Sequence, residues 1–312
     1  MGNAESSLRS LKIEKASIFD MNTIVKMASV CHREDPIFRR MLSNPAKISL
    51  YRIFGPFYIR LKFESFKAVV SSKIVGYMLL KHQVHGRFST TIWDVAVDPD
   101  FRGKGIGTSL MKTAEKNVEK RYQYITLAVM EDNTTALKLY QKLGYTNLSE
   151  TCFAITKIPP KVKVENTVEL EPISGKEALS CRSKHSLAVV EALSGSYGRE
   201  IYQSVYLSNR LERGIDRFRI VTSGKEIGYV SLKLKKGLAS VFFILHPDFW
   251  HTNSEVEVIE TIMGHVAKKR KDRTELCVMQ GYERSLESTL TEMGYMSERI
   301  IGRIGLVKKL GT

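Results

Sequence analysis

Hydrophobic and polar positions in the first half of the chain follow two periods in turn, which predict strands and helices. Apolar residues alternate with polar ones in the strand-like runs and recur every three or four residues in the helix-like runs. Residues 90–97 are apolar at nearly every position, as expected for a strand covered on both faces. The predicted order is a strand at 11–15, a helix from Ile18 to Ala28, strands at 66–70, 73–82 and 90–97, a helix at 106–118, a strand at 124–130 and a helix at 135–143.

The second half of the chain repeats short motifs of the first half at offsets of 148 to 152 residues. A register that drifts by so little indicates one fold that occurs twice, with small changes in loop length. The repeated pairs are Val75-Gly76-Tyr77 with Ile227-Gly228-Tyr229, Pro99-Asp100-Phe101 with Pro247-Asp248-Phe249, and Leu143-Gly144-Tyr145 with Met293-Gly294-Tyr295.

The repeat predicts two α/β domains with mixed sheets in tandem. Paired prolines at Pro159-Pro160 stiffen the chain between the two copies and remove backbone donors, which is typical of a linker. The predicted organisation is a tail at 1–10, a first domain at 11–157, a linker at 158–167 and a second domain at 168–312.

Composition narrows the class of protein. The 312 residues include 48 Lys and Arg against 33 Asp and Glu, a net charge of +15, and no apolar run is long enough to span a membrane. Four scattered cysteines without a C-x-x-C pair argue against a zinc site or a disulfide framework and suit a reducing compartment. We therefore expect a cytoplasmic protein with no bound metal.

The positive charge has two interpretations. Residues 1–160 hold 24 basic and 14 acidic side chains, so the first half carries most of the excess. Either this charge serves an anionic ligand, or it is a solvated coat. The basic run at 268–273 follows a predicted helix, where cations are favoured by the helix dipole, and nucleic acid is not expected as a partner. Residues 1–6 fit a myristoylation pattern, whose meaning depends on the source of the protein.

A glycine-rich run follows the strand at 90–97 and precedes the helix at 106–118. It reads Arg102-Gly103-Lys104-Gly105-Ile106-Gly107. Glycines let backbone N–H groups approach a ligand closely, and the start of a helix offers unpaired donors and the positive end of a dipole. The run therefore predicts a phosphate-binding loop, although its spacing is neither that of a Walker loop nor that of a dinucleotide fingerprint.

Two segments together resemble the GNAT superfamily of N-acetyltransferases. Residues 95–107 are similar to that family's pyrophosphate-binding motif, and residues 133–145, which end in Leu139-Tyr140-Gln141-Lys142-Leu143-Gly144-Tyr145, are similar to its helix-plus-strand motif. The resemblance covers about residues 11–157 well and residues 168–310 as a degraded copy. It implies acetyl-CoA as the cofactor and a primary amine, on a peptide or a small molecule, as the acceptor.

The resemblance also implies roles for individual residues. The strand edge at Val95, Ala96 and Val97 would pair with the pantetheine arm, and a backbone N–H near Val95 would polarise the thioester carbonyl. Asn133 would bind the cofactor, and Tyr140 would protonate the departing thiolate; alternatively, Tyr140 is an ordinary core tyrosine. The backbone amides expected to hold the pyrophosphate are those of Arg102, Gly103, Lys104, Gly105, Ile106, Gly107 and Thr108.

The general base is less clearly marked. Some members of the superfamily place a glutamate on the strand that here reads Leu127-Ala128-Val129, which has no carboxylate. Asp94 is the nearest candidate, while a structural role for Asp94, an ordered water and Glu131 are the alternatives. The absent carboxylate also leaves a second hypothesis open, that the chain is a non-catalytic acetyl-CoA sensor or scaffold.

The second copy departs from the cofactor motif. Trp250, His251, Asn253 and Glu255 stand where the first copy has Arg102, Gly103, Gly105 and Gly107, and Leu290 stands in place of Tyr140. Side chains there would fill the loop, and a carboxylate would repel a pyrophosphate. We expect the second copy not to bind acetyl-CoA. The acceptor and the oligomeric state are not indicated by the sequence.

Overall fold

A computed structural model describes most of the chain. The myristoylation pattern at residues 1–6 and residues 158–166 of the predicted linker lie outside the described residues. None of the described helices is long and apolar enough to cross a membrane. The described residues are 10–32, 57, 59, 62–82, 89–157, 167–195, 199, 202, 214–235, 238–250, 252–269, 273–279, 290–291, 293–294 and 297–311.

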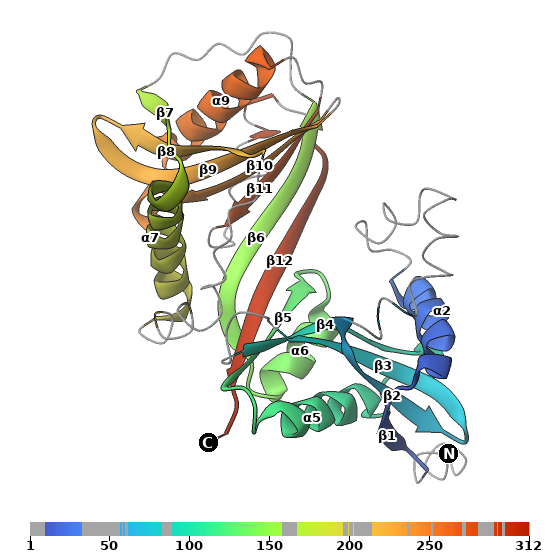
Figure 1. The fold of residues 1–312 in the computed structure, drawn as a ribbon. Coiled ribbons are helices and arrows are strands. Elements are labelled where there is room, and N and C mark those ends of the chain that lie inside the picture. Colours follow the sequence, from blue (N-terminus) through green and yellow to red (C-terminus); the bar gives the residue numbers. More distant parts are fainter. Residues whose placement is uncertain are drawn as a thin grey trace. The chain divides into compact units, whose positions relative to one another are not determined.

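The elements of the first half confirm the predicted order (Figure 1). Gly144 has a positive φ of 84° after the last helix, as a glycine C-cap does. The elements are β1 (Lys12–Lys15), η1 (Ile18–Asp20), α2 (Met21–Cys31), β2 (Glu64–Val70), β3 (Lys73–His82), β4 (Ser89–Val97), η2 (Pro99–Phe101), α5 (Ile106–Val118), β5 (Tyr124–Met130), α6 (Thr134–Lys142) and β6 (Thr146–Lys157).

The second half repeats this order almost element by element, including the short turn of 3-10 helix after its fourth strand. The elements are β7 (Val168–Pro172), α7 (Gly175–Ser194), β8 (Asp216–Thr222), β9 (Lys225–Lys235), β10 (Leu238–Leu245), η3 (Pro247–Phe249), α9 (Asn253–Lys268), β11 (Arg273–Met279) and β12 (Ser297–Lys309).

Local geometry supports the interpretation of two copies. Asp98 caps η2 by accepting a hydrogen bond from Asp100 N, and His246 caps η3 in the same way. A Cβ added to Gly76 would lie 3.1 Å from a backbone oxygen of the next strand, and one added to Gly228 would lie 2.5 Å from the corresponding oxygen. The same close approach of two strands therefore requires glycine at the same place in each copy.

Tertiary contacts divide the chain into two compact units. Unit 1 comprises residues 1–127 and 308–312, and unit 2 comprises residues 128–307. The strands of unit 1 lie in the order β1-β2-β3-β4, followed by β5 up to Leu127, and those of unit 2 lie in the order β12-β6-β11-β10-β9-β8-β7, with β12 counted up to Val307. The only parallel pairs in these described sheets are β4 with β5 and β10 with β11, so both sheets are mixed. The expected α/β class with mixed sheets is confirmed.

In unit 1, α2 and α5 cover opposite faces of the sheet (Figure 1). Tyr77 and Leu79 of β3 belong to the core cluster that contains α2. Gly76 faces the other way, where a Cβ would lie 3.3 Å from Leu110 of α5. The helical stripe predicted from Ile106 to Val118 is buried, because it packs on this face. The expected start of the first helical stripe is wrong at Ile18, which is 45% exposed.

In unit 2, β6 lies between β11 and β12 and runs antiparallel to both. By the repeat, β11 corresponds to β5 and β12 corresponds to β6. The last strand of the first half therefore pairs with the penultimate strand of the second half, which is an exchange of strands between copies. The predicted domains are continuous in sequence, with boundaries at 157 and 168, whereas the compact units meet at residues 127 and 128 and again at 307 and 308. The predicted boundaries stay a prediction.

Candidate active site

The loop between β4 and α5 has the backbone of an anion-binding site. Gly103 and Gly105 have φ of 73° and 77°, a backbone conformation that residues with a Cβ rarely adopt. A Cβ at either position would meet nothing within 4 Å, so the space in front of the loop is open. Gly105 is the N-cap of α5 and offers no side chain to cap the helix. The first N–H groups of α5 are therefore suited to an external acceptor.

Two of the predicted loop residues are engaged with the loop itself. The backbone N–H of Arg102 donates to Pro99 O at 3.3 Å, and its Nε donates to Val97 O at 3.1 Å. Lys104 Nζ donates to Asp100 O at 3.1 Å and lies over the ring of Phe101. The amide of Arg102 thus holds the preceding turn, and the donors left for a ligand begin at Gly103.

The first half of strand β4 pairs with a strand on each side, whereas its second half pairs with β3 alone. Its parallel pairing with β5 runs from Ser89 to Ile92 and ends there among the described residues. Its antiparallel pairing with β3 continues to Val97. Residues 93–97 therefore present a backbone edge on the side from which β5 diverges. The prediction that β4 is covered on both faces holds for its first half, whereas Trp93 is 59% exposed.

The direction of the backbone groups on this edge follows from one hydrogen bond. Asp98 N donates to Val75 O at 2.9 Å, so that pair is hydrogen-bonded and the next pair, Val97 with Gly76, is not. Residues two apart in a strand direct their backbone groups to the same edge. The N–H and C=O groups of Val95 and Val97 thus point away from β3, while those of Ala96 point toward it.

Asp94 is held by two side chains that come from other elements of unit 1. Its Oδ2 accepts a hydrogen bond of 2.7 Å from the hydroxyl of Tyr77 on β3. Its Oδ1 lies 2.8 Å from Nε2 of His32, the residue that ends α2. The Tyr77 hydroxyl also lies 3.3 Å from that nitrogen. Asp94 is therefore oriented rather than solvated, and it fixes a partly exposed imidazole.

His32 was not a candidate from the sequence. It lies 62 positions before Asp94, and a lone histidine at the end of a helix has no local pattern that indicates chemistry. The approach of the α2 C-terminus to β4 brings the two together. Glu131, an alternative base, lies in unit 2, where its backbone N–H donates to Gly302 O.

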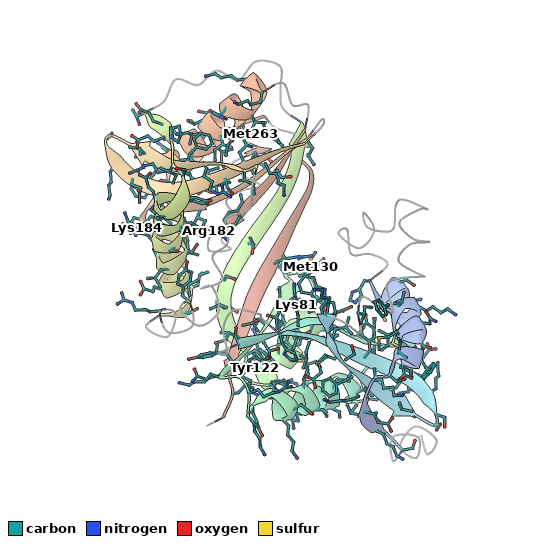
Figure 2. The ribbon with its side chains drawn as sticks, in the orientation of Figure 1. Lys81, Tyr122, Met130, Arg182, Lys184 and Met263 are labelled. Atoms are coloured by element: carbon teal, nitrogen blue, oxygen red, sulfur yellow. The ribbon has the colours of Figure 1, made fainter. Side chains whose placement is uncertain are left out.

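An exposed aromatic surface adjoins Asp94. The centroids of the Trp93 and Phe63 rings lie 5.9 Å apart. Lys81 Nζ lies 4.4 Å from the centroid of the Trp93 ring (Figure 2). A flat ring beside an oriented carboxylate is suited to the apolar part of an acceptor.

Asn133 and Tyr140 belong to unit 2. Asn133 caps α6, since its Oδ1 accepts from Ala136 N at 3.1 Å. Tyr140 is buried on α6, with its ring 5.9 Å from that of Tyr145. Tyr140 is packed as its structural alternative, a core tyrosine, expects, and the roles of Asn133 and Tyr140 toward a cofactor stay predictions.

The corresponding loop of the second copy makes the same internal contact with different residues. Trp250 Nε1 donates to Leu245 O at 3.2 Å, as Arg102 Nε does to Val97 O. Glu255, which replaces Gly107, is buried in the first turn of α9. A carboxylate there occupies the favourable end of the helix dipole, which supports the expectation that this copy holds no pyrophosphate.

Comparison with known proteins agrees with this geometry. The sequence profile described as "Acetyltransferase (GNAT) family" matches residues 34–145. The thialysine N-epsilon-acetyltransferase of Mus musculus is 33% identical over 157 residues, which cover 46% of this chain and 89% of that protein. The chain belongs to the GNAT acetyltransferase family. Its other relatives include N-alpha-acetyltransferase 30 of Dictyostelium discoideum, 30% identical over 114 residues, 36% of this chain and 60% of that protein.

Solved structures extend the GNAT fold to the whole chain. A GCN5-related N-acetyltransferase from Sphaerobacter thermophilus has a TM-score of 0.56 at 13% identity and covers 97% of this chain and 96% of its own. Both halves therefore have the architecture that the repeat predicts. The matched part of this chain spans 40% of N-alpha-acetyltransferase 30 of Xenopus laevis, to which it is 36% identical over 112 residues, 35% of this chain.

Proposed function

We propose that the first GNAT copy transfers an acetyl group from acetyl-CoA to a primary amine, by direct attack while both are bound. The observation that carries this proposal is the glycine loop at 103–107, which leads from the open edge of β4 into the uncapped N-terminus of α5. One continuous segment thus offers backbone N–H groups that can bind a pyrophosphate and a strand edge that can pair with a pantetheine arm. These are two parts of acetyl-CoA.

The residues present fit acetyl-CoA. A Cβ at Gly103 or Gly105 would meet nothing within 4 Å, and the backbone donors from Gly103 to Thr108 at the start of α5 suit a pyrophosphate. The edge at Val95 and Val97 suits the amides of a pantetheine arm, which would add as an extra strand, although Val97 O also accepts from Arg102 Nε. When bound, acetyl-CoA supplies an activated acyl thioester. The N–H of Val95 points to the same edge and would polarise the acyl carbonyl.

Asp94 and His32 supply the basic group that the sequence left open. An amine must lose a proton before or during attack. With Nε2 directed at Asp94, the other ring nitrogen of His32 is the one that would accept this proton, either directly or through a water. Asp94 would fix the tautomer of the imidazole and stabilise its protonated form, and Tyr77 would hold Asp94. Tyr140 would supply the proton to the departing thiolate of CoA.

The proposed acceptor is an α-amine of a peptide or an ε-amine of a lysine-like side chain. The names of the relatives, N-alpha-acetyltransferase 30 and thialysine N-epsilon-acetyltransferase, indicate these two classes. Trp93 would pack on the aliphatic or peptide part that carries the amine. We further propose a cytoplasmic location, as the cysteine usage suggests.

The first experiment is isothermal titration of acetyl-CoA into the full chain, followed by release of free CoA with a panel of peptides and lysine analogues. We expect one site per chain, abolished in Gly105→Glu, and turnover with at least one amine. Two sites would show that the second copy also binds. Binding without turnover on any amine would favour the sensor alternative, and no binding would overturn both functions.

A further inference from the structure

A second group of chemically reactive side chains lies in unit 2, on elements that carry none of the residues of the proposed reaction. Cys181 and His185 lie on α7, and Glu226 lies on β9. The thiol sulfur, one ring nitrogen and a carboxylate oxygen all lie within 4.8 Å of one another. His185 is fully buried and Cys181 is nearly so. Three different metal-ligating groups are thus gathered in a place sheltered from water.

We propose that Cys181, His185 and Glu226 bind one zinc ion, with a water in the fourth position. Thiolate, imidazole and carboxylate are the three protein ligands that zinc takes. Residues four apart lie on one face of a helix, so α7 presents Cys181 and His185 together. Ligand distances of about 2.0 to 2.3 Å imply separations of roughly 3.3 to 3.8 Å between donor atoms in a tetrahedral site. Movements of about an ångström would suffice to form it.

The chemistry of the three groups gives the ion its charge balance. Cys181 and His185 lie in the interior, and a cysteine binds zinc as the thiolate while a histidine binds it as the neutral imidazole. Zinc binding would transfer the thiol proton to solvent, and the thiolate and Glu226 would together balance the charge of the ion.

The present contacts of the three residues leave a polar atom unsatisfied. His185 Nε2 lies 3.1 Å from Glu226 Oε1, while Nδ1 is buried without a hydrogen-bond partner among the described residues. The Cys181 thiol makes a long contact, 3.6 Å, to Gly228 O and also hydrogen-bonds the Glu226 side chain. Because an imidazole binds a metal through either ring nitrogen, the unsatisfied atom leaves His185 able to act as a ligand.

Neighbouring charges decide how strongly a metal is bound. Lys184 Nζ lies 3.0 Å from Glu226 Oε1, and Arg219 Nη1 lies 3.8 Å from Oε2. The ring of His246 stands edge-on to His185 at 6.1 Å. Lys184 is a surface residue of α7, 61% exposed, and its side chain can turn into water (Figure 2). Lys184 therefore competes with the ion for Glu226, which gives a test that does not remove a ligand.

The experiment uses cobalt(II) as a spectroscopic probe in the full chain after removal of metals with a chelator. We expect one equivalent of cobalt(II) to produce a thiolate-to-metal charge-transfer band and the intense visible bands of four-coordinate geometry, both bleached by zinc. Cys181→Ser should lose the charge-transfer band, and Glu226→Gln should weaken binding on the order of 100-fold. Lys184→Met should tighten it roughly two- to fivefold.

Cys31→Ser is the matched control, because Cys31 is a free thiol of unit 1 and its variant should keep the band. If Cys181→Ser does not fold, Glu226→Gln and Lys184→Met carry the test, with circular dichroism as the check on folding. A wild-type chain without the charge-transfer band, or a band that survives in folded Cys181→Ser, overturns the proposal. Acetyl-CoA titration of the same samples keeps this result separate from the proposed acetyl transfer.

Discussion

Asp94 Oδ1 lies 2.8 Å from His32 Nε2, which joins the end of α2 to the strand that carries the open edge. A carboxylate placed in this way fixes the imidazole tautomer and stabilises the cation that forms when the ring accepts a proton. In the proposed reaction, His32 would therefore act as the base and Asp94 would support it.

His32→Gln is expected to reduce turnover by about 10² to 10⁴, the usual contribution of a positioned general base. Acetyl-CoA affinity should stay within about twofold, since no loop donor is changed. Release of CoA under saturating substrates measures the first quantity and calorimetry the second. Asp94→Asn should have a smaller effect on kcat than His32→Gln, because the base is retained without its orientation.

Tyr77→Phe is the matched variant for this network. It removes the hydroxyl that bonds to Asp94 Oδ2 and leaves the ring in the α2 core. We expect a loss of turnover below tenfold. If His32→Gln folds and turns over as fast as the wild type, the base is a water or another side chain, and the His32–Asp94 pair is structural.

Gly105→Ala tests the phosphate loop through the backbone. An alanine at φ of 77° costs about 1 to 2 kcal/mol, so the loop is expected to relax and acetyl-CoA affinity to fall about tenfold or more. Gly175→Ala provides the control, because Gly175 also has a positive φ, 53°, with nothing within 4 Å, but starts α7 in unit 2. Equal affinity in both variants, measured by calorimetry, would show that the loop conformation does not matter for binding.

Local patterns were sufficient to predict most elements. A helical stripe of apolar residues predicts α5 and its buried face, because the side of a helix that packs on a sheet is apolar every three or four residues. The stripe consists of Ile106, Leu110, Met111, Ala114 and Val118. Ser71-Ser72 likewise marks a tight turn, where both residues adopt positive φ. In these cases the residues that decide the structure are neighbours in the chain.

Other features depend on long-range approach and left no local pattern. The contact of His32 with Asp94 requires the end of a helix to meet a strand 62 residues later. The pairing of β6 with β11 joins a strand of the first copy to a strand of the second, and no local pattern in either strand indicates this partner. The cluster of Cys181, His185 and Glu226 likewise has no local pattern, because Glu226 is 41 residues from His185.

Tyr140→Phe separates the catalytic role from the structural one. If the hydroxyl protonates the departing thiolate, the variant should lose about 10² or more in kcat with little change in acetyl-CoA affinity, because the ring still packs against Tyr145. Tyr145→Phe is the control, since it removes the neighbouring hydroxyl from a similar environment. A thermal melt of each variant checks the fold. Equal kcat in the two variants would assign Tyr140 to the core alone.

Glu64 links three basic residues of unit 1 and should make this unit sensitive to acid. Its side chain contacts Lys15, His82 and Arg121 at 2.7 to 2.9 Å. Burial alone would raise the pKa of Glu64, but hydrogen bonds from Arg121, Lys15 and His82 lower it from 4.5 to about 2. The folded state therefore binds this proton more weakly than the unfolded state does.

A lowered carboxyl pKa contributes stability that is fully present above the unfolded value and is lost as pH falls from about 4.5 to about 2, by about 3 kcal/mol at most. Urea unfolding of the full chain across this range should show the loss, and Glu64→Gln should flatten that part of the profile while lowering stability at pH 7. Glu169→Gln, at an exposed carboxylate of β7, is the control and should leave the slope unchanged. If both variants keep the wild-type slope between pH 4.5 and 2, other carboxylates govern acid unfolding and the three contacts of Glu64 contribute little.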